Sequence, residues 1–477
     1  MKLDQLNINE NIAKAKELMK NPQHCSPEFS VVILLILSLF EILLPRIFKN
    51  SKNSSIPPSQ DPNRTKPNKD EHGNSIKKPG GQPGRDGKNL SLVDKPDEII
   101  TVSINLDNLP KGHIYTPAGF AKRQVVDVII LKHVKEYQLE MVADENGKIY
   151  TAEAPGGISR PIQYGASVKA MAVYLNMFQM LPYARLEDFF ETQAGIAVSA
   201  GSLCNFNKEA FNLLDQFEEI AKNKLAAGEI LHTDETSINI NGKKHWLHNA
   251  SSDLWALLMP HATRGRKAMD DMGVLPFFRG VMVHDHWVPY LLYKDCKHSL
   301  CNAHHLRELQ AVIESEPTHT WASGIKELLL KINDETKKHD GVLPENQAQL
   351  YKNEYQKILA KGDEECPPPL PNPEAPKKKG RIKKTKARNL LERLRNFAED
   401  TLRFMTRKNI PFTNNQGERD LRMNKVQQKI SGCYKSIESA KIACRIRSYL
   451  LTCQKHGIFP TDALNILFSG KLPDFCK

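Results

Sequence analysis

Hydrophobic and polar positions form their most regular pattern between residues 228 and 290. Alternation with a period of two predicts half-buried strands, and a short apolar run bounded by turn residues predicts a fully buried strand. Asn241-Gly242 separates two alternating runs and is a strong signal for a two-residue hairpin. The predicted elements are strands over Leu231–Ile240, Lys244–Ala250 and Leu254–Met259, a helix over Arg264–Met272, and a strand over Val281–Val283.

The order strand, strand, strand, helix, strand predicts an α/β domain of the ribonuclease H-like type. In that layout one acidic residue lies on the first strand and a second follows the fourth. Asp234 lies in the first predicted strand, and Asp285 follows the fourth after a gap of 285 − 234 = 51 residues. Three strands and one helix occupy about that length, so the spacing supports the pairing of the two acids.

Helical and irregular segments precede this domain. The apolar run Val31–Leu44 contains Glu41, ends before Pro45 and is shorter than the ~20 residues that span a bilayer. We interpret it as an apolar helix that packs against a partner, such as another copy of the chain, with a membrane anchor as the less favoured alternative. The following residues are rich in Asn, Ser, Pro and Lys and predict a disordered basic linker. Its Lys78–Gly87 segment, which includes the Gly80–Gly84 turn, is either a phosphate-cradling loop or a flexible turn.

Short β-branched runs such as Val125–Ile130 then predict a small β-rich module. Helices are expected over Ser167–Met180, from Tyr183 to Gly195, and from Ser199 or Ser202 onward. A helix, a short turn with glycine and a second helix form the outline of a DNA-reading helix-turn-helix, and also of any helical hairpin.

A long insertion follows Asp285, because the next acidic candidate, Glu418, lies 418 − 285 = 133 residues later. Its Lys377–Arg388 connector has eight cationic residues among twelve and is either a phosphate-gripping arm or a solvated linker. The expected divisions are an N-terminal helical multimerisation segment (1–50), the linker (51–97), the β-rich module (98–163), the helix-turn-helix-like region (164–226), the first part of the catalytic domain (227–310), the insertion and connector (311–400), the remainder of that domain (401–450) and a C-terminal tail region (451–477).

Composition narrows the class of partner and the compartment. Lys and Arg exceed Asp and Glu by 67 − 55 = 12, which favours a polyanionic partner such as nucleic acid. The nine cysteines are scattered without a C-x-x-C pair, which indicates reduced thiols and a cytoplasmic location.

Asp234, Asp285 and Glu418 are the candidate catalytic and metal-binding residues. Mg²⁺ is a hard ion that prefers oxygen ligands, and a pair of such ions promotes in-line displacement at a phosphodiester. Carboxylates from distant parts of the sequence, two at strand ends and one at a helix start, suit such a site. Asp420 and Glu399 are the main rivals for the third position.

Glu418 opens a predicted helix capped by Thr413, Asn414 or Asn415. At 100° per residue, Glu418 shares one face with three cations, which suits a metal ligand beside a nucleic-acid backbone. The candidate DNA-contacting cations are Arg419, Arg422, Lys425 and Lys429 of this helix and Lys383, Lys384, Lys386 and Arg388 of the connector.

Two groups of histidines also stand out. Cys301, His304 and His305 would ligate zinc only with a further ligand pair from elsewhere, and a structural helical motif is the alternative. His284 and His286 flank Asp285, and we expect them to orient its carboxylate rather than to transfer protons.

Several of these segments, in one order, resemble the transposases of Insertion Sequence 66-type bacterial elements. The resemblance rests on the following motifs: Thr233-Asp234-Glu235-Thr236 with Trp246-Leu247-His248, His284-Asp285-His286-Trp287, Cys301-Asn302-Ala303-His304-His305-Leu306-Arg307-Glu308-Leu309, and Asn414-Asn415-x-x-Glu418-Arg419-x-Leu421-Arg422 with Lys429-Ile430-Ser431-Gly432. Together with similarities in the linker and in residues 164–185, it covers most of the chain from about residue 50 to 470.

The resemblance implies a DDE transposase with a ribonuclease H-like catalytic domain, acting on the inverted-repeat ends of its own element in a bacterial nucleoid. It implies Mg²⁺ or Mn²⁺ as cofactor, Asp234, Asp285 and Glu418 as the triad, and double-stranded DNA at the element ends and the target as partner. A homo-oligomer on DNA and accessory proteins of the same element would be further partners. Many members carry a cysteine zinc module before the helix-turn-helix, whereas residues 98–163 contain no Cys, so zinc is not expected there. The alternatives are a ribonuclease H-like nuclease without joining activity and a non-catalytic DNA-binding regulator.

Overall fold

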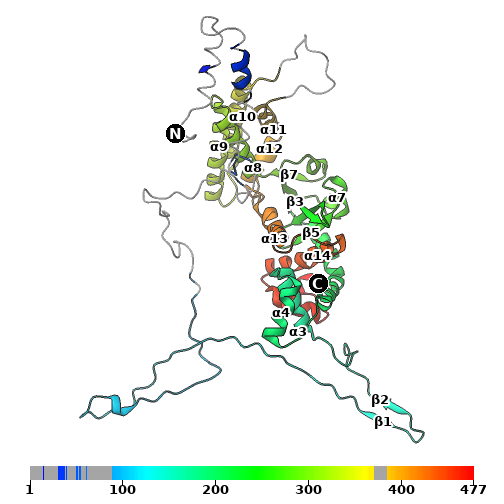
Figure 1. Ribbon diagram of the computed structural model, residues 1–477. Coiled ribbons are helices and arrows are strands. Elements are labelled where there is room, and N and C mark those ends of the chain that lie inside the picture. Colours follow the sequence, from blue (N-terminus) through cyan, green and yellow to red (C-terminus); the bar gives the residue numbers. More distant parts are fainter. Residues whose placement is uncertain are drawn as a thin grey trace. The chain divides into compact units, whose positions relative to one another are not determined.

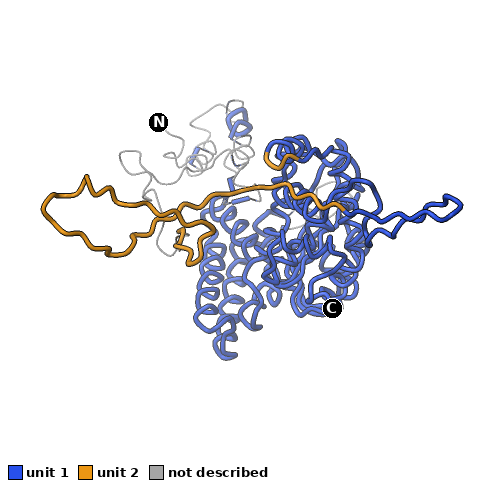
Figure 2. Tube along the Cα trace, turned by 90° about the horizontal axis from the view of Figure 1, so that it is seen from below, with its two compact units in different colours: residues 1–64, 137–192, 196–477 blue, residues 65–136, 193–195 orange. Residues whose placement is uncertain are grey.

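The computed structural model describes residues 14–15, 29, 31–37, 39, 50–51, 53–54, 61, 87, 89–369 and 384–477. The chain divides into two compact units, one with residues 1–64, 137–192 and 196–477 and the other with residues 65–136 and 193–195 (Figure 2). Most of the expected N-terminal helical segment, the Gly80–Gly84 segment and Lys383 lie outside the described residues. All three acidic candidates belong to the larger unit.

One five-stranded mixed sheet organises the larger unit, with the strand order β5-β4-β3-β6-β7. Figure 1 labels β3, β5 and β7 of this sheet. β3 pairs antiparallel with β4 and parallel with β6, β4 pairs antiparallel with β5, and β6 pairs parallel with β7. The strands are β3 (Ile230–Ile240), β4 (Lys243–Ser251), β5 (Ala256–His261), β6 (Val281–His284) and β7 (Lys297–Leu300). The expected α/β class is confirmed, and β7 is a strand that the sequence pattern did not predict.

The predicted hairpin joins β3 to β4. Asn241 and Gly242 have φ values of 48° and 77°, so both occupy the left-handed region. That conformation is what a two-residue hairpin of type I′ requires, and Asn and Gly adopt it at the lowest steric cost. The hairpin fixes the register in which Ile240 faces Lys243.

Helices cover the sheet and its outer edge. α13 packs against β3 and β4, and α14 packs along β5. The Ser448 and Thr452 hydroxyls of α14 accept hydrogen bonds from the backbone amides of Leu258 (2.8 Å) and Ala256 (3.1 Å), so they satisfy donors on the free edge of β5. The elements around the sheet are α7 (Arg266–Asp271), η4 (Leu275–Phe277), η5 (Val288–Leu292), α8 (Asn302–Ser315), α13 (Asn415–Ser431), α14 (Ile437–Lys455), α15 (Pro460–Phe468) and η6 (Asp474–Cys476).

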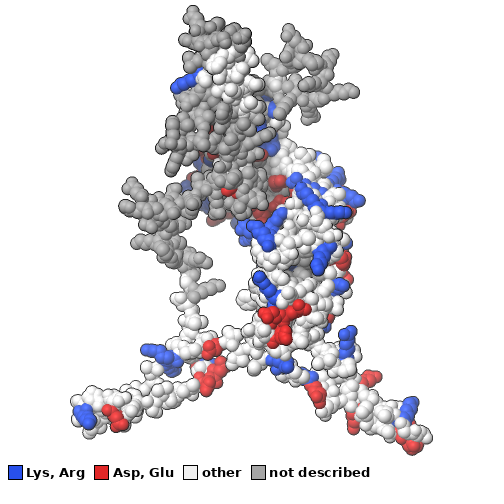
Figure 3. Space-filling view, in the orientation of Figure 1, with Lys and Arg blue, Asp and Glu red and all other residues white. Residues whose placement is uncertain are grey.

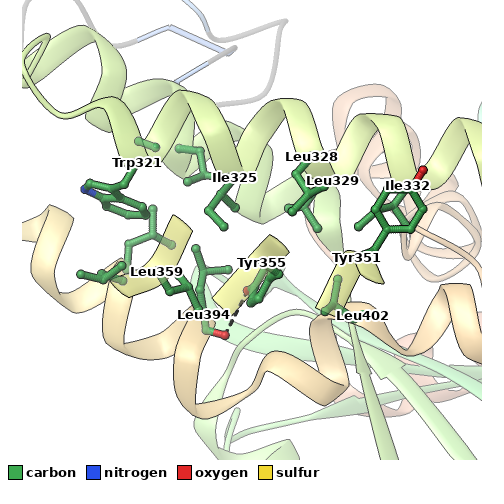
Figure 4. Packing of buried hydrophobic residues seen from close by; sticks show 14 of the residues in the cluster. Trp321, Ile325, Leu328, Leu329, Ile332, Tyr351, Tyr355, Leu359, Leu394 and Leu402 are labelled. Carbon is green, nitrogen blue, oxygen red and sulfur yellow. Dashed lines mark hydrogen bonds between the residues drawn. The ribbon is translucent and has the colours of Figure 1, made fainter. Parts of the chain in front are cut away.

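A helical insertion follows α8, and its buried apolar side chains (Figure 4) form one cluster with Val281 of β6 and with Leu309 and Val312 of α8. Trp321, Ile325 and Leu329 of α9 are fully buried against residues of α10 and α11. The Tyr355 hydroxyl donates to the Leu394 carbonyl at 3.0 Å, so the one polar group of this side chain is satisfied inside the core. The helices are α9 (Thr320–Lys338), α10 (Glu345–Glu365), α11 (Lys386–Asn396) and α12 (Ala398–Thr406).

A series of helical segments leads from residue 166 to the sheet. α3 continues into a short π-helix, and Gly195 has a φ of 62° after α4, as expected for a glycine that ends a helix. The Ser199 hydroxyl caps α5 by accepting from the Ser202 amide at 3.2 Å. The segments are α3 (Ala166–Val173), the π-helix η3 (Tyr174–Phe178), α4 (Tyr183–Ala194), α5 (Ala200–Leu213) and α6 (Asp215–Ala226).

The β-rich module expected over residues 98–163 differs from the structure. That stretch contains one two-stranded ribbon, β1 (Met141–Ala143) with β2 (Ile149–Thr151), and the short 3-10 turn η2 (Leu106–Asn108). Val125–Ile130, expected as a strand, pairs with no other segment, and its apolar side chains are exposed. The β-branched pattern therefore identified extended backbone but not a packed module.

No helix among the described residues is long and apolar enough to cross a membrane. Residues 31–37, within the apolar run discussed above, are helical.

Candidate active site

Asp234 lies on β3, and Asp285 directly follows β6, the parallel neighbour of β3. Their ladder pairs His232 with Val283, an offset of 283 − 232 = 51 residues. The two acids are separated by the same number, 285 − 234 = 51, so continuing the register by two residues places Asp285 beside Asp234. The gap noted in the sequence is thus the offset between two paired strands.

The pKa of Asp234 also indicates that Asp285 and Glu418 lie near this carboxyl. Burial raises the pKa of this carboxyl well above its ordinary value, and the nearby Glu235, Asp285 and Glu418 carboxylates raise it further. The Glu235 backbone amide donates to its Oδ1 at 2.9 Å and opposes the rise in this pKa. A buried carboxyl whose pKa is raised by neighbouring carboxylates is one property of a site that attracts cations.

Asn414 fixes the start of α13 on β3, next to Asp234. Its Nδ2 donates to the Thr233 carbonyl at 2.8 Å, and its Oδ1 lies 2.9 Å from His232 Nδ1. The Glu418 amide in turn donates to the Asn414 carbonyl at 3.3 Å, which closes the first turn of the helix. Three hydrogen bonds therefore connect the position of Glu418 to the strand that carries Asp234.

Gly417 allows this close approach. A Cβ at this position would lie 2.9 Å from Asn414 Nδ2, closer than real Cβ contacts. Its carbonyl accepts from Asn249 Nδ2 of β4 at 3.3 Å, which adds a second link between the helix and the sheet. Gln416 Nε2 donates to the Ser252 carbonyl, just beyond β4.

The two rivals of Glu418 have other surroundings. Asp420 is buried and pairs with Lys455 Nζ at 3.1 Å. Glu399 is exposed near the start of α12. Glu418, in contrast, is close enough to Asp234 to raise the pKa of that carboxyl.

Backbone contacts and two histidines surround Asp285. The Trp287 amide donates to its Oδ1 at 3.0 Å, which orients the carboxylate. His284 is fully buried, contacts the Asp285 carbonyl through Nδ1, and lies 2.9 Å from His298 Nδ1 through Nε2. Burial lowers the pKa of His284 to about 3, and burial with the nearby Arg393 lowers that of His286 to about 4. His284 thus contacts the backbone of Asp285 rather than its carboxylate, and the orienting role expected of the two histidines stays a prediction.

The Cys301 motif lies at the same site. Cys301 precedes α8, and its Sγ, a His304 ring nitrogen and a Glu418 carboxylate oxygen lie within 4.8 Å of one another. Arg307 Nη2 is 4.0 Å from Glu418 Oε1. His305 instead faces inward, with Nδ1 3.0 Å from Asn302 Oδ1, so it is a structural residue. The sequence motif had grouped these residues, but nothing in the pattern placed Glu418 among them.

A second acid beside the site has a different role. Glu235 is almost completely buried and accepts from Arg264 Nε (2.8 Å) and Nη2 (2.6 Å) and from the Tyr290 hydroxyl. The Arg264 guanidinium lies 3.9 Å from the Trp287 ring centroid and 4.8 Å from that of Trp246. This stack of one cation between two indoles stabilises the segment that follows Asp285. Sequence reasoning missed Arg264, although both tryptophans lie in motifs that it had identified.

The expected DNA-contacting cations fall into two groups. Arg419, Arg422, Lys429 and Lys386 are exposed. Three others have partners within the protein, and their contact with DNA stays a prediction: Lys425 donates to the Ser237 carbonyl, Lys384 pairs with Glu392 at 2.5 Å, and the buried Arg388 pairs with Asp363 at 2.7 Å and Glu392 at 2.9 Å. On the face shown in Figure 3, basic side chains form separate groups rather than one continuous patch.

The family comparison agrees with the motifs. A family model described as Transposase IS66 family matches residues 161–442. The chain belongs to this family. The match spans α3 to the first part of α14 and includes Asp234, Asp285 and Glu418. A second model, a family of unknown function (DUF6444), matches residues 41–91. No curated protein matches the chain.

Membership of this transposase family supports a role in transposition. Transposition is a form of DNA processing, so the family also implies DNA binding. It also agrees with the positive net charge of the chain, since phosphate contacts by Lys and Arg drive association with DNA.

Proposed function

We propose that this transposase cleaves DNA at the inverted-repeat ends of its element and joins the freed 3′ ends to target DNA, with Asp234, Asp285 and Glu418 as metal ligands. The observation that carries the proposal is the shared offset of 51 residues between the acids and the β3–β6 ladder. The sheet supports it too, because three antiparallel strands followed by two parallel strands, in the order β5-β4-β3-β6-β7, is the arrangement of a ribonuclease H-like domain.

The three carboxylates fit Mg²⁺ or Mn²⁺. They supply only oxygen ligands, as hard divalent ions prefer, and burial with mutual repulsion raises the pKa of Asp234, a cost that bound cations would offset. When bound, two such ions activate the attacking water or 3′-hydroxyl and stabilise the leaving oxygen.

The protein's own residues would hold the DNA and the acids in place. Arg307 lies beside Glu418, and Arg393 is close enough to Asp285 for that carboxylate to raise the pKa of its guanidinium, which burial lowers. Two partly exposed arginines next to the acids suit binding of the phosphates that flank the cleaved bond.

The helices before the sheet are the proposed DNA-reading part. α4, the turn at Gly195 and α5 form a helix-turn-helix outline, and α5 exposes Asn205 and Lys208 while Leu203 and Phe206 are buried. Asn is able to read adenine and Lys to contact phosphate. We include a homo-oligomer on DNA and accessory proteins of the element in the proposal, as partners still to be tested.

The experiment uses the full chain and linear duplexes that carry the inverted repeats flanking its gene. Asp234→Asn, Asp285→Asn and Glu418→Gln should each lower Mg²⁺-dependent nicking and joining on the order of 10³-fold or more, with DNA binding retained. The matched control is Glu399→Gln, at an exposed acid, and it should keep wild-type rates. Strand transfer retained in one of the three variants would remove that residue from the site.

The products separate the alternatives. Nicked DNA without joined products would indicate a nuclease, and binding without nicking in Mg²⁺ would indicate a DNA-binding regulator.

A further inference from the structure

Three side chains with different ligand chemistry meet at the start of α8. Cys301 Sγ, a His304 ring nitrogen and a Glu418 carboxylate oxygen lie within 4.8 Å of one another. Thiolate, imidazole and carboxylate are the three ligand types that Zn²⁺ takes in proteins, at about 2.0 to 2.3 Å from the ion. Small side-chain rotations would bring all three atoms to one ion, with a fourth position left for water.

The backbone is arranged to stabilise charge on the sulfur. Cys301 is the N-cap residue of α8, and the Asn414 amide donates to its Sγ at 3.1 Å. The His304 amide donates to the Cys301 carbonyl at 3.1 Å, which closes the first turn of α8 behind the sulfur. Amides directed at a sulfur favour the thiolate, which is the form that binds metals.

His304 adds a second observation. Its Nδ1 is buried and has no hydrogen-bond partner among the described residues. Buried polar atoms of native proteins nearly always have a partner, so an imidazole nitrogen without one calls for a ligand. His305, its neighbour, has a partner in Asn302 and is excluded.

We propose that Cys301, His304 and Glu418 bind Zn²⁺, and that zinc withdraws Glu418 from the Mg²⁺ site and so inhibits the enzyme. The inhibitory half of this proposal, that zinc inhibits the enzyme, rests on the proposed function, because it needs Glu418 as a Mg²⁺ ligand. The binding half, that the three residues bind Zn²⁺, does not. Binding replaces the thiol proton, which passes to solvent. Mg²⁺ does not compete for the sulfur, since it prefers oxygen ligands, so the two ions share only the carboxylate.

Binding is tested on the full chain with Co²⁺ as a spectroscopic substitute for Zn²⁺. The wild-type protein should show a thiolate-to-cobalt charge-transfer band that Zn²⁺ abolishes. Cys301→Ser should lose the band and bind Zn²⁺ on the order of 100-fold more weakly, since even loss of an outer partner costs 10- to 100-fold. The matched control is Cys433→Ser, at an exposed thiol outside the cluster, and it should keep the band.

His304→Ala tests the site independently of the sulfur, in case the serine variant does not fold. It should also weaken Zn²⁺ binding, and a wild-type band and affinity in both the Cys301 and the His304 variants would overturn the proposal.

Inhibition is measured as the ratio of Mg²⁺-dependent nicking with and without Zn²⁺, so that each protein is its own reference. Zinc should inhibit the wild type and the Cys433→Ser variant but not Cys301→Ser. Equal inhibition of all three would overturn the inhibitory half. A cobalt band that depends on Cys301, in a protein that never nicks DNA, would support the zinc site and contradict the proposed function.

Discussion

Asn414 donates its side-chain amide to the backbone carbonyl of Thr233, at 2.8 Å. The bond joins residues that are 414 − 233 = 181 positions apart, one just before Asp234 and the other four before Glu418. It connects the helix with the third acid to the strand with the first. The long insertion between them can therefore change without moving the acids apart.

Asn414→Ala should weaken both stability and nicking. It leaves the Thr233 carbonyl and His232 without their partner in a buried site, which should lower the free energy of unfolding by about 1–3 kcal/mol. Nicking should fall by about 10- to 100-fold, because a shift of Glu418 by about 1 Å is costly. Urea unfolding and single-turnover nicking measure the two effects. Asn415→Ala, at the exposed neighbour, is the control. Wild-type nicking by Asn414→Ala would show that other contacts place Glu418.

Gly417→Ala should destabilise the folded protein by about 1–3 kcal/mol, since the new methyl group would meet Asn414 Nδ2 at 2.9 Å. The control is Gly201→Ala in α5, where the nearest atom is Ser199 Oγ at 3.7 Å. Alanine there should be neutral or stabilising by up to about 1 kcal/mol, because it restricts the unfolded chain. Equal urea midpoints for the two variants would contradict the steric argument.

Asp234→Asn should stabilise the metal-free protein at neutral pH. Burial and then the neighbouring acids raise the folded-state pKa of Asp234, so folding favours its protonated form. Wild-type stability therefore falls as pH rises from the unfolded pKa, about 3.9, through the raised folded value. The asparagine variant does not lose stability in this way. The difference in free energy of unfolding between the variant and the wild type should therefore be near zero at low pH and grow with pH to a plateau.

Thermal unfolding in EDTA across this pH range measures that advantage. Glu399→Gln should follow the wild type. An advantage of Asp234→Asn that does not change with pH would have to come from packing rather than from charge.

Arg264→Ala should lower the free energy of unfolding by about 1–3 kcal/mol. It leaves the buried Glu235 carboxylate with fewer partners, but the arginine itself is 38% exposed, which reduces the cost below that of a fully buried pair. Adding Glu235→Gln to this variant should recover part of the loss, as a double-mutant cycle would show. Arg266→Ala, at a surface pair, should cost less than about 0.5 kcal/mol. No recovery in the double variant would mean that the arginine acts through its ring contacts alone.

Local patterns predicted the sheet well and long-range contacts poorly. Asn241-Gly242 and the alternation around it determine the hairpin, because backbone conformation and a buried face act within a few residues. β7 was missed because Lys297–Leu300 is short and becomes a strand only by pairing with β6. Val125–Ile130 was expected in a module because β-branched residues favour extended backbone, but pairing needs a partner strand that propensity does not provide.

The candidate site shows the same difference between local patterns, which were predictive, and long-range contacts, which were not. The pairing of Asp234 with Asp285 followed from strand order, since parallel neighbours bring their ends together. The proximity of Cys301 and His304 to Glu418 depends on how α8 and α13 meet, which no periodicity records. Helical phase placed Lys425 beside Glu418, but its bond to the Ser237 carbonyl gives this side chain a structural role.

The hydroxyls of Ser448 and Thr452 have a consequence for where the chain can be shortened. The family match ends at residue 442, within α14, and both hydroxyls lie beyond it. A chain cut there would leave the outer edge of β5 with unpaired amides, available to the same edge of another molecule. Such a fragment would contain all three acids and still aggregate, so the last 477 − 442 = 35 residues protect the sheet from self-association.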